Sequence, residues 1–294
     1  MRIIVTGGTG FVGRHVVRHA LDAGMSVVAT QHRQPPDHAD AEWATVDIGN
    51  PAQVDDLIRR SGADAIINAA AALSATMAPL GACQNWRINA VAPVDVARSA
   101  SRHGVRLVHV SSDAVFSGRE EAYTESDLPD PTYPYGAAKA AAELGVATVF
   151  PEAALVRVSL IHGDGDEMAN RDQHILDLAA GRVPGFYLTD AWRCPVGVND
   201  LARALLELAA GDYAGVLNVA GPEAITFHNL ARAVAECHGE DPDRIPAATR
   251  AETGAGRPGR VILDTTRARQ LLKTQLKGFS DMLAQPSTVA GVNL

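Results

Sequence analysis

The eight residues TGGTGFVG at positions 6–13 lie between a short apolar run and an amphipathic helical repeat. Gly7 permits a tight turn, Gly10 allows a pyrophosphate to approach the backbone, and Gly13 allows helix and strand to pack closely. The phosphates would lie at the helix N-terminus, where free amides and the helix dipole favour anions. Because the glycines follow a strand and open a helix, we interpret them as a dinucleotide-binding turn rather than a purely structural one.

Apolar strands alternate with helical repeats along the first half of the chain. Short strands are expected at 3–5, 26–30, 65–68, 107–110 and 154–158, and the longest helices at 84–103 and 135–148. This alternation predicts an α/β fold, a Rossmann-type doubly wound parallel sheet with helices on both faces.

The pattern loosens after about residue 160. Helices are expected over 172–180, 199–210 and 226–238, with strands over 195–198 and 216–219. We assign 1–160 to an NAD(P)-binding Rossmann domain and 161–294 mainly to a smaller C-terminal α/β substrate lobe. The segment 195–219 is left open as a return to the first domain.

Composition narrows the class of protein. The chain has 294 residues, a formal net charge of -8 and no run of like charges, which argues against nucleic acid and against a polybasic membrane surface. No apolar stretch approaches the roughly 18 residues that span a bilayer, and the chain opens on a strand rather than a signal peptide, so we expect a cytoplasmic protein. The histidines and cysteines show no metal-ligand spacing, and we assign no metal.

The end of the second strand bears on cofactor choice. An NAD enzyme usually carries an acidic residue there to hold the ribose hydroxyls, and this chain has Gln31, His32 and Arg33 instead. His32 and Arg33 could face a 2′-phosphate or could belong to a solvated loop, and we favour NADP(H) over NAD(H). Asp47 and Ile48, after the third strand, are placed to meet the adenine, although Asp47 could simply end that strand.

Three side chains suggest carbonyl chemistry. Ser112 follows a strand at the edge where open α/β sheets bind ligands, and Tyr135 and Lys139 share one helix face. Reduction of a ketone needs a proton on oxygen, and a nearby ammonium would lower the pKa of a phenol toward neutrality. Lys139 would supply that charge and bind the nicotinamide ribose, while Ser112 polarises the carbonyl. Taken singly, the Tyr–Lys pair could be a surface pair and Ser112 a local cap.

The chain resembles the extended short-chain dehydrogenase/reductases over nearly its whole length, and within them the dTDP-4-dehydrorhamnose reductase-like, sugar nucleotide-binding group. The segments that carry this resemblance are TGGTGFVG at 6–13, NAAA at 68–71, RINAVAP at 87–93, VSSDAVFSG at 110–118, TYPYGAAKAAAE at 132–143, RCPVGVNDLARAL at 193–205, LNVAGPEAITFHNLA at 217–231 and RPGRVILDTTRARQLL at 257–272.

The resemblance implies roles for individual residues. Ser112, Tyr135 and Lys139 match the catalytic residues. Further cofactor contacts are implied at Thr9, Phe11 and Val12 in the glycine turn. Ala69, Ala70 and Ala71 match a segment that passes over the cofactor. Asn89 matches a helix residue that helps order the site, and the backbone at Ser159 and Leu160 is expected to meet the nicotinamide.

The expected substrate pocket departs from the family pattern. Ser112, Ala114, Val115 and Tyr135 would line it, but Ala114 replaces a usual aromatic residue, and Leu160 stands where the rhamnose enzymes tend to have Trp. Arg193 and Arg257 are expected to contact a diphosphate or another polar end of a substrate, the alternative being ordinary surface arginines.

The resemblance implies an NADPH-dependent reductase of a nucleotide-activated 4-keto sugar in deoxysugar biosynthesis, with hydride transfer and Tyr135 as proton donor. One alternative is a sugar-nucleotide epimerase or dehydratase, which is disfavoured because Asp113 should point away from the side of Ser112. Another is a non-catalytic NADP-binding regulatory subunit. A small-molecule substrate and a homodimer are the partners that the resemblance suggests.

Overall fold

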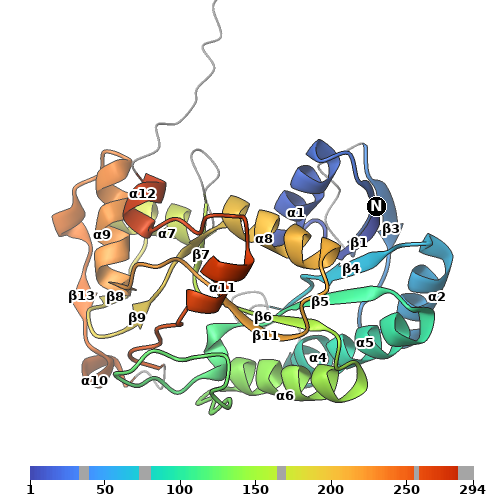
Figure 1. The fold of residues 1–294 in the computed structure, drawn as a ribbon. Coiled ribbons are helices and arrows are strands. Elements are labelled where there is room, and N and C mark those ends of the chain that lie inside the picture. The colour runs from blue at the N-terminus through green and yellow to red at the C-terminus, as the bar shows by residue number, and fades with distance from the viewer. Residues whose placement is uncertain (33–39, 73–80, 164–169, 255–257, 284–294) are drawn as a thin grey trace, which may run out of the picture.

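A parallel sheet of seven strands forms the centre of the part of the chain that the computed structural model describes, namely residues 1–32, 40–72, 81–163, 170–254 and 258–283 (Figure 1). Its strand order is β3-β2-β1-β4-β5-β6-β11. The strands are β1 (Arg2–Thr6), β2 (Ser26–Gln31), β3 (Glu42–Thr45), β4 (Ala65–Asn68), β5 (Arg106–Val110), β6 (Ala154–Val158) and β11 (Gly215–Val219). Every pairing within this sheet is parallel.

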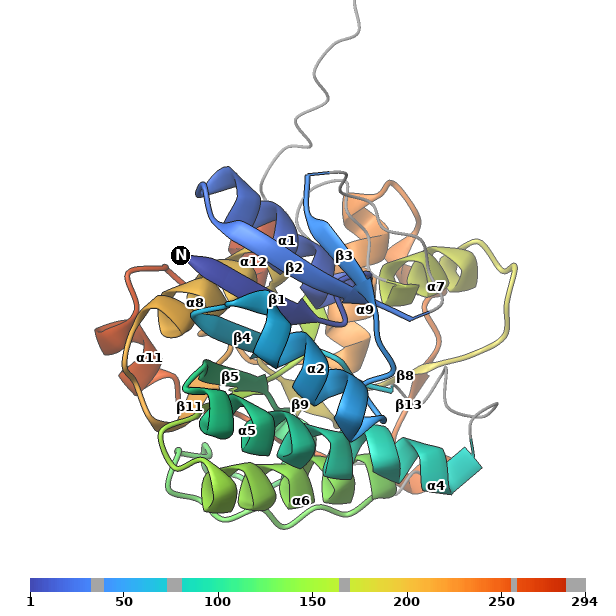
Figure 2. The same cartoon turned by 90° about the vertical axis from the view of Figure 1, so that its right-hand side faces the viewer.

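Helices cover both faces of the sheet (Figure 2). Ile3 and Val5 of β1 pack in the core under α1 (Phe11–Asp22), α8 (Val198–Ala210) and α11 (Thr266–Leu271). Ile4 packs in the opposite core, under α2 (Pro51–Ser61) and α5 (Ala92–His103), with α6 (Pro134–Val149) beside α5. Successive strand residues point to opposite faces of the sheet, so a continuous run of apolar residues packs into the cores on both faces. The predicted doubly wound fold is confirmed.

The single helix expected at 84–103 is interrupted. The chain forms α4 (Gly81–Trp86), a π-helical turn over Arg87–Val91, and then α5. Pro93 lacks an amide hydrogen and its ring would clash with the carbonyl four residues earlier, so a regular α-helix cannot continue through this position. The amide of Ala92 instead donates to the carbonyl of Arg87, five residues back.

Short paired strands and four helices form most of the remaining structure, on the left of Figure 1. The pairs are β7 (Ile161–His162) with β10 (Val196–Gly197), β8 (Tyr187–Leu188) with β13 (Ala247–Ala248), and β9 (Trp192–Arg193) with β12 (Ile225–Thr226). The helices are α7 (Asn170–Ala179), α9 (Phe227–Cys237), α10 (Arg250–Thr253) and α12 (Phe279–Leu283). A separate apolar cluster, including Ile175, Leu230 and Phe279, joins α7, α9 and α12.

Between these lobe elements, the chain returns to the sheet: β10 leads into α8, which packs on α1, and β11 pairs with β6. The division into domains at residue 160 stays a prediction. Within the described residues, no helix combines the length and the apolar character that crossing a bilayer requires.

Candidate active site

The glycine turn connects β1 to α1 with little room for side chains. Gly7 has φ of +67°, and a Cβ there would lie 2.9 Å from the Cα of Ala70. A Cβ on Gly13 would lie 2.0 Å from the carbonyl oxygen of Gly7, so helix and turn could not approach as they do. Gly10 is the N-cap of α1, and the first turn of this helix has no acidic residue. The turn therefore fits the diphosphate of a dinucleotide, which needs close backbone approach and an anion-accepting helix end.

The structure brings Ser112 and Tyr135 together at the carboxyl end of β5. Ser112 caps a 3-10 turn over Asp113–Val115, with its Oγ accepting from the amide of Ala114 at 3.2 Å. The Ser112 hydroxyl lies close enough to Tyr135 to lower the pKa of its phenol. Close approach of α6 depends on Gly136, where a Cβ would lie 2.0 Å from the carbonyl oxygen of Ala114.

The pKa of Tyr135 shifts in the opposite direction to the one that the sequence predicts. Burial raises the pKa of its phenol, Tyr133 and Asp113 add to the rise, and the hydrogen bond with Ser112 opposes it. The lowered pKa expected from Lys139 is therefore wrong for this arrangement. The reason is that Lys139 Nζ is directed elsewhere, donating to the carbonyl of Val110 at 2.6 Å.

Lys139 is buried against β5. Its Nζ lies 3.4 Å from Nε2 of His109, whose side chain is also fully buried. Burial lowers the pKa of Lys139 to about 8, although the carboxylate of Glu143 opposes the shift. Glu143 in turn pairs with Arg157 of β6, with Nη2 to Oε2 at 2.9 Å, and accepts a hydrogen bond from Ser111. These contacts fix the face of α6 that carries Tyr135 and Lys139.

The segment after β4 lies beside the glycine turn. The amide of Ala70 points to Thr6 Oγ1 at 3.4 Å. Asn89, in the π-helical turn, accepts from the amide of Ala72 at 3.0 Å and donates to its carbonyl at 2.9 Å. The interrupted helix thus anchors the chain just after Ala69, Ala70 and Ala71, of which Ala71 is exposed.

His32 and Asp47, which are predicted to lie near the adenosine end of the cofactor, are both exposed. His32 is exposed just after β2, and Arg33 lies outside the described residues. Asp47 is exposed and its Oδ1 accepts from the amide of Gly49 at 2.9 Å, so this carboxylate shapes a turn. Ile48 is half-buried against the apolar core beneath α2.

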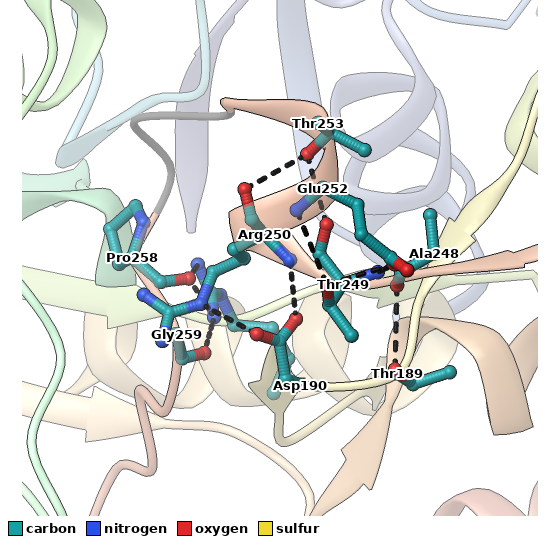
Figure 3. Close-up of polar contacts among 10 residues, drawn as sticks. Thr189, Asp190, Ala248, Thr249, Arg250, Glu252, Thr253, Pro258 and Gly259 are labelled. Atoms are coloured by element: carbon teal, nitrogen blue, oxygen red, sulfur yellow. Dashed lines mark hydrogen bonds and ion pairs between the residues drawn. The ribbon is translucent and has the colours of Figure 1, made fainter.

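Arg193 does not lie at the surface. Its Nε is 3.3 Å from Oδ2 of Asp113, and its Nη1 donates to the carbonyls of Trp192 at 2.7 Å and Gly259 at 3.0 Å. Figure 3 shows the carbonyls of Pro258 and Gly259 that this guanidinium meets, next to the Asp190–Arg250 pair. Arg193 is thus occupied within the chain, and Arg257 lies outside the described residues.

Asp113, which pairs with Arg193, is also hydrogen-bonded to Ser159. Ser159 Oγ donates to Asp113 Oδ2 at 2.7 Å and accepts from the amide of Cys194 at 3.2 Å. Burial raises the pKa of Asp113, whereas Arg193 and Ser159 oppose the shift. Leu160 is half-buried and packs on the lobe cluster, and Ala114 and Val115 are buried.

Three residues near the site were missed by sequence reasoning. Gly136 and His109 sit inside quoted or predicted elements, and their roles emerge only once helix and strand are packed. Arg171 on α7 has a buried Nη1 with no hydrogen-bond partner among the described residues, and it interacts electrostatically with Asp113. Within the same residues, no group of three or more His, Cys, Asp or Glu side chains is placed to hold a metal ion.

This geometry, with a glycine turn, a strand-end serine and a helix carrying Tyr and Lys, defines an extended short-chain dehydrogenase/reductase, a class of NAD(P)-dependent oxidoreductases. The chain belongs to the family described as the RmlD substrate binding domain, whose model matches residues 1–288.

Several similar proteins carry reductase names. A dTDP-4-dehydrorhamnose reductase of Mycobacterium tuberculosis is 34% identical over 252 residues, covering 83% of this chain and 78% of that protein. The probable low-salt glycan biosynthesis reductase Agl14 of Haloferax volcanii is 30% identical, covering 97% and 96%. The crystal structure of a dTDP-4-dehydrorhamnose reductase from Bacillus anthracis in complex with NADP has the same fold, with a TM-score of 0.81, 23% identity and 96% of each chain covered.

Proposed function

We propose that this protein is an NADPH-dependent reductase of a nucleotide-activated 4-keto sugar, with Ser112, Tyr135 and Lys139 as catalytic residues. The observation that carries the proposal is that Ser112, just after β5, lies beside Tyr135 in the first turn of α6, with the buried Lys139 four residues further along that helix. The reductase names of the relatives support the reaction and the sugar-nucleotide substrate class.

The glycine turn at 6–13 would hold the diphosphate of the cofactor, and Ala69, Ala70 and Ala71 would pass over it. Lys139 would meet the nicotinamide ribose, and the backbone at Ser159 and Leu160 the nicotinamide. When bound, NADPH supplies the hydride that reduces the carbonyl carbon. His32, exposed just after β2 where an acidic residue would select NAD, supports the preference for NADPH.

Proton delivery follows from the electrostatics of Tyr135. Since its pKa is raised, the phenol is protonated near neutrality and is poised to donate to the substrate oxygen. Ser112 would hold that oxygen beside it. For the ammonium of Lys139 to stabilise the phenolate that remains after proton transfer, its Nζ would have to turn toward Tyr135 from the carbonyl of Val110, to which it donates here.

A dehydratase would need a free carboxylate near Ser112. The expectation that Asp113 points away from Ser112 is wrong, because Ser112 Oγ lies 3.4 Å from Asp113 Oδ1. Asp113 is nevertheless buried, accepts from Ser159 at 2.7 Å and pairs with Arg193, so it is not free to act as a base. This arrangement supports the reductase over that alternative. We propose that the residues after 160, apart from α8, β11 and α11, form the substrate lobe.

The test compares wild type with Tyr135→Phe for NADPH and NADH oxidation on a panel of nucleotide-linked 4-keto sugars. We expect turnover with NADPH and a loss of about 10²–10⁴-fold in kcat in the variant. NADPH binding, measured by fluorescence, should be unchanged. NADPH binding without turnover on any sugar in the panel would overturn the proposed substrate.

A further inference from the structure

A row of buried polar side chains crosses three strands beneath α6. Thr6, Asn68 and His109 are direct neighbours in the register of β1, β4 and β5, and all three are at most 1% exposed. Thr6 Oγ1 donates to Asn68 Oδ1 at 2.6 Å, and Asn68 Nδ2 lies 3.1 Å from His109 Nδ1. His109 Nε2 then lies 3.4 Å from Lys139 Nζ. The row connects the strand that leads into the glycine turn to the proposed catalytic lysine.

The imidazole in this row is neutral. Burial holds the pKa of His109 well below its usual value, and the charge of Lys139 adds to this effect. A neutral imidazole carries one hydrogen, so one ring nitrogen donates and the other accepts. The side of the ring that carries the hydrogen therefore determines what Lys139 meets.

Two arrangements satisfy both ring nitrogens of His109 and the Nζ of Lys139. With the carboxamide nitrogen of Asn68 facing Nδ1, the hydrogen lies on Nε2 and faces Nζ, which suits a neutral amine. With the carboxamide turned over, its oxygen accepts from Nδ1–H and Nε2 accepts from Nζ, which suits an ammonium. Turning an amide exchanges only oxygen and nitrogen, and the Thr6 hydroxyl can donate or accept.

We propose that His109 is a positioning residue for Lys139, and that the Thr6–Asn68–His109 row switches its hydrogens as Lys139 gains or loses its proton. The proton switch does not depend on the proposed reductase function, but its role in catalysis does. The row would hold the ammonium form that Tyr135 needs after proton transfer, through side chains that are themselves buried.

Two other titratable side chains of α6, Glu143 and Tyr135, lie near Lys139. Glu143, one turn along α6, raises the pKa of Lys139 but is itself paired with Arg157 of β6. Tyr135, one turn earlier on α6, is the remaining titratable neighbour on that helix. The switch should therefore follow Lys139, whose pKa of about 8 lies within reach of a titration.

The direct test is NMR of the full-length protein labelled with ¹⁵N-histidine, titrated from about pH 6 to 10. The ring nitrogens of His109 are assigned by their loss in His109→Gln. We expect a neutral ring throughout, with its hydrogen moving from Nδ1 to Nε2 as pH rises through about 8. The step should vanish in Lys139→Met. A ring that keeps one tautomer across this range, or a step that persists in Lys139→Met, would overturn the proposal.

Asn68→Asp provides a second test with a defined sign. A carboxylate only accepts, so it holds the hydrogen on Nδ1 and favours the ammonium of Lys139. The alkaline loss of NADPH affinity, measured by fluorescence, should move up by about one pH unit in this variant. It should move down by about one unit in His109→Leu, which removes the acceptor, and return toward wild type in His109→Gln.

The two proposals fail in different ways. Wild-type protein that does not bind NADPH would contradict the proposed function. The histidine titration would still show whether the His109 hydrogen moves with the protonation of Lys139. NADPH binding whose pH dependence is the same in Asn68→Asp, His109→Leu and wild type would overturn the row and leave the reductase intact.

Discussion

The two sides of the candidate site are built from different parts of the chain. On the sheet side, Lys139 and Glu143 lie four residues apart on α6 and contact β5 and β6 directly beneath that helix. On the lobe side, Arg193 of β9 contacts Asp113, which lies 80 residues earlier, and the carbonyls of Pro258 and Gly259, about 65 residues later. Both sides hold buried charges, but only the first is fixed by regular secondary structure.

This difference separates the proposed chemistry from the proposed substrate choice. Helix periodicity and strand register hold Ser112, Tyr135 and Lys139, so any chain with this packing presents the same catalytic face. The lobe side is held by loop carbonyls and one guanidinium, which can change without altering the sheet. Under the proposed function, the departures from the family pattern at Ala114 and Leu160 would therefore alter the substrate pocket and leave the proposed catalytic residues in place.

Breaking the sheet side should have the largest effect on stability. Arg157→Met leaves Glu143 charged and buried without its partner, and we expect a loss of about 3–5 kcal/mol in the free energy of unfolding. Denaturant unfolding followed by circular dichroism measures it. The double variant Glu143→Gln, Arg157→Met should lose less, because no unpaired charge remains. Equal losses in the single and double variants would contradict an essential ion pair.

Gly136→Ala tests the approach of α6 to the strand end. The added Cβ would lie 2.0 Å from the backbone oxygen of Ala114, so α6 must shift and carry Tyr135 away from Ser112. A misplacement of about 1 Å costs roughly 10²-fold in kcat. Gly145→Ala is the matched control on the same helix, since its Cβ meets only the side chain of Val94. Equal kcat values for the two variants would show that the contact does not position Tyr135.

Arg193→Lys tests the lobe side. Lysine keeps the charge but cannot form the fork that meets Asp113 and two loop carbonyls together, and we expect a loss of about 1–3 kcal/mol in the free energy of unfolding. The KM for the sugar should rise more than kcat falls. Arg250→Lys is the control, because its pair with Asp190 (Figure 3) is partly exposed and should cost less than about 1 kcal/mol. A fall in kcat with unchanged KM would instead tie Arg193 to the chemistry.

The sheet side was also the more predictable from sequence. TGGTGFVG, the strand at 107–110 and the Tyr135–Lys139 spacing are local patterns, and local patterns specify turns, strands and helix faces. The interruption before α5 was missed because the helical repeat continues through it, although Pro93 provided the signal.

Contacts between distant segments could not be read in the same way. Arg193 was expected to meet a diphosphate, yet it is buried among carbonyls that come from residues more than 60 positions away. The direction of the Tyr135 pKa shift depends on burial and on where Lys139 Nζ points, and neither follows from an i, i+4 spacing.

Arg171 gives the smallest expected change in stability and sharpens the assignment of the lobe side. Its buried Nη1 has no hydrogen-bond partner in the described part of the chain, and its burial is opposed by the charges of Asp172 and Asp113. Arg171→Met therefore removes both a desolvation cost and an electrostatic gain, which largely cancel. The free energy of unfolding should change by less than about 1 kcal/mol. If this cation meets the anionic part of the sugar nucleotide, the KM of the substrate rises about tenfold, which corresponds to one hydrogen bond to a charged group. Arg182→Met, which removes an exposed ion pair with Asp177 just after the same helix, should leave KM unchanged. A KM that is the same in both variants would place substrate recognition elsewhere on the lobe side.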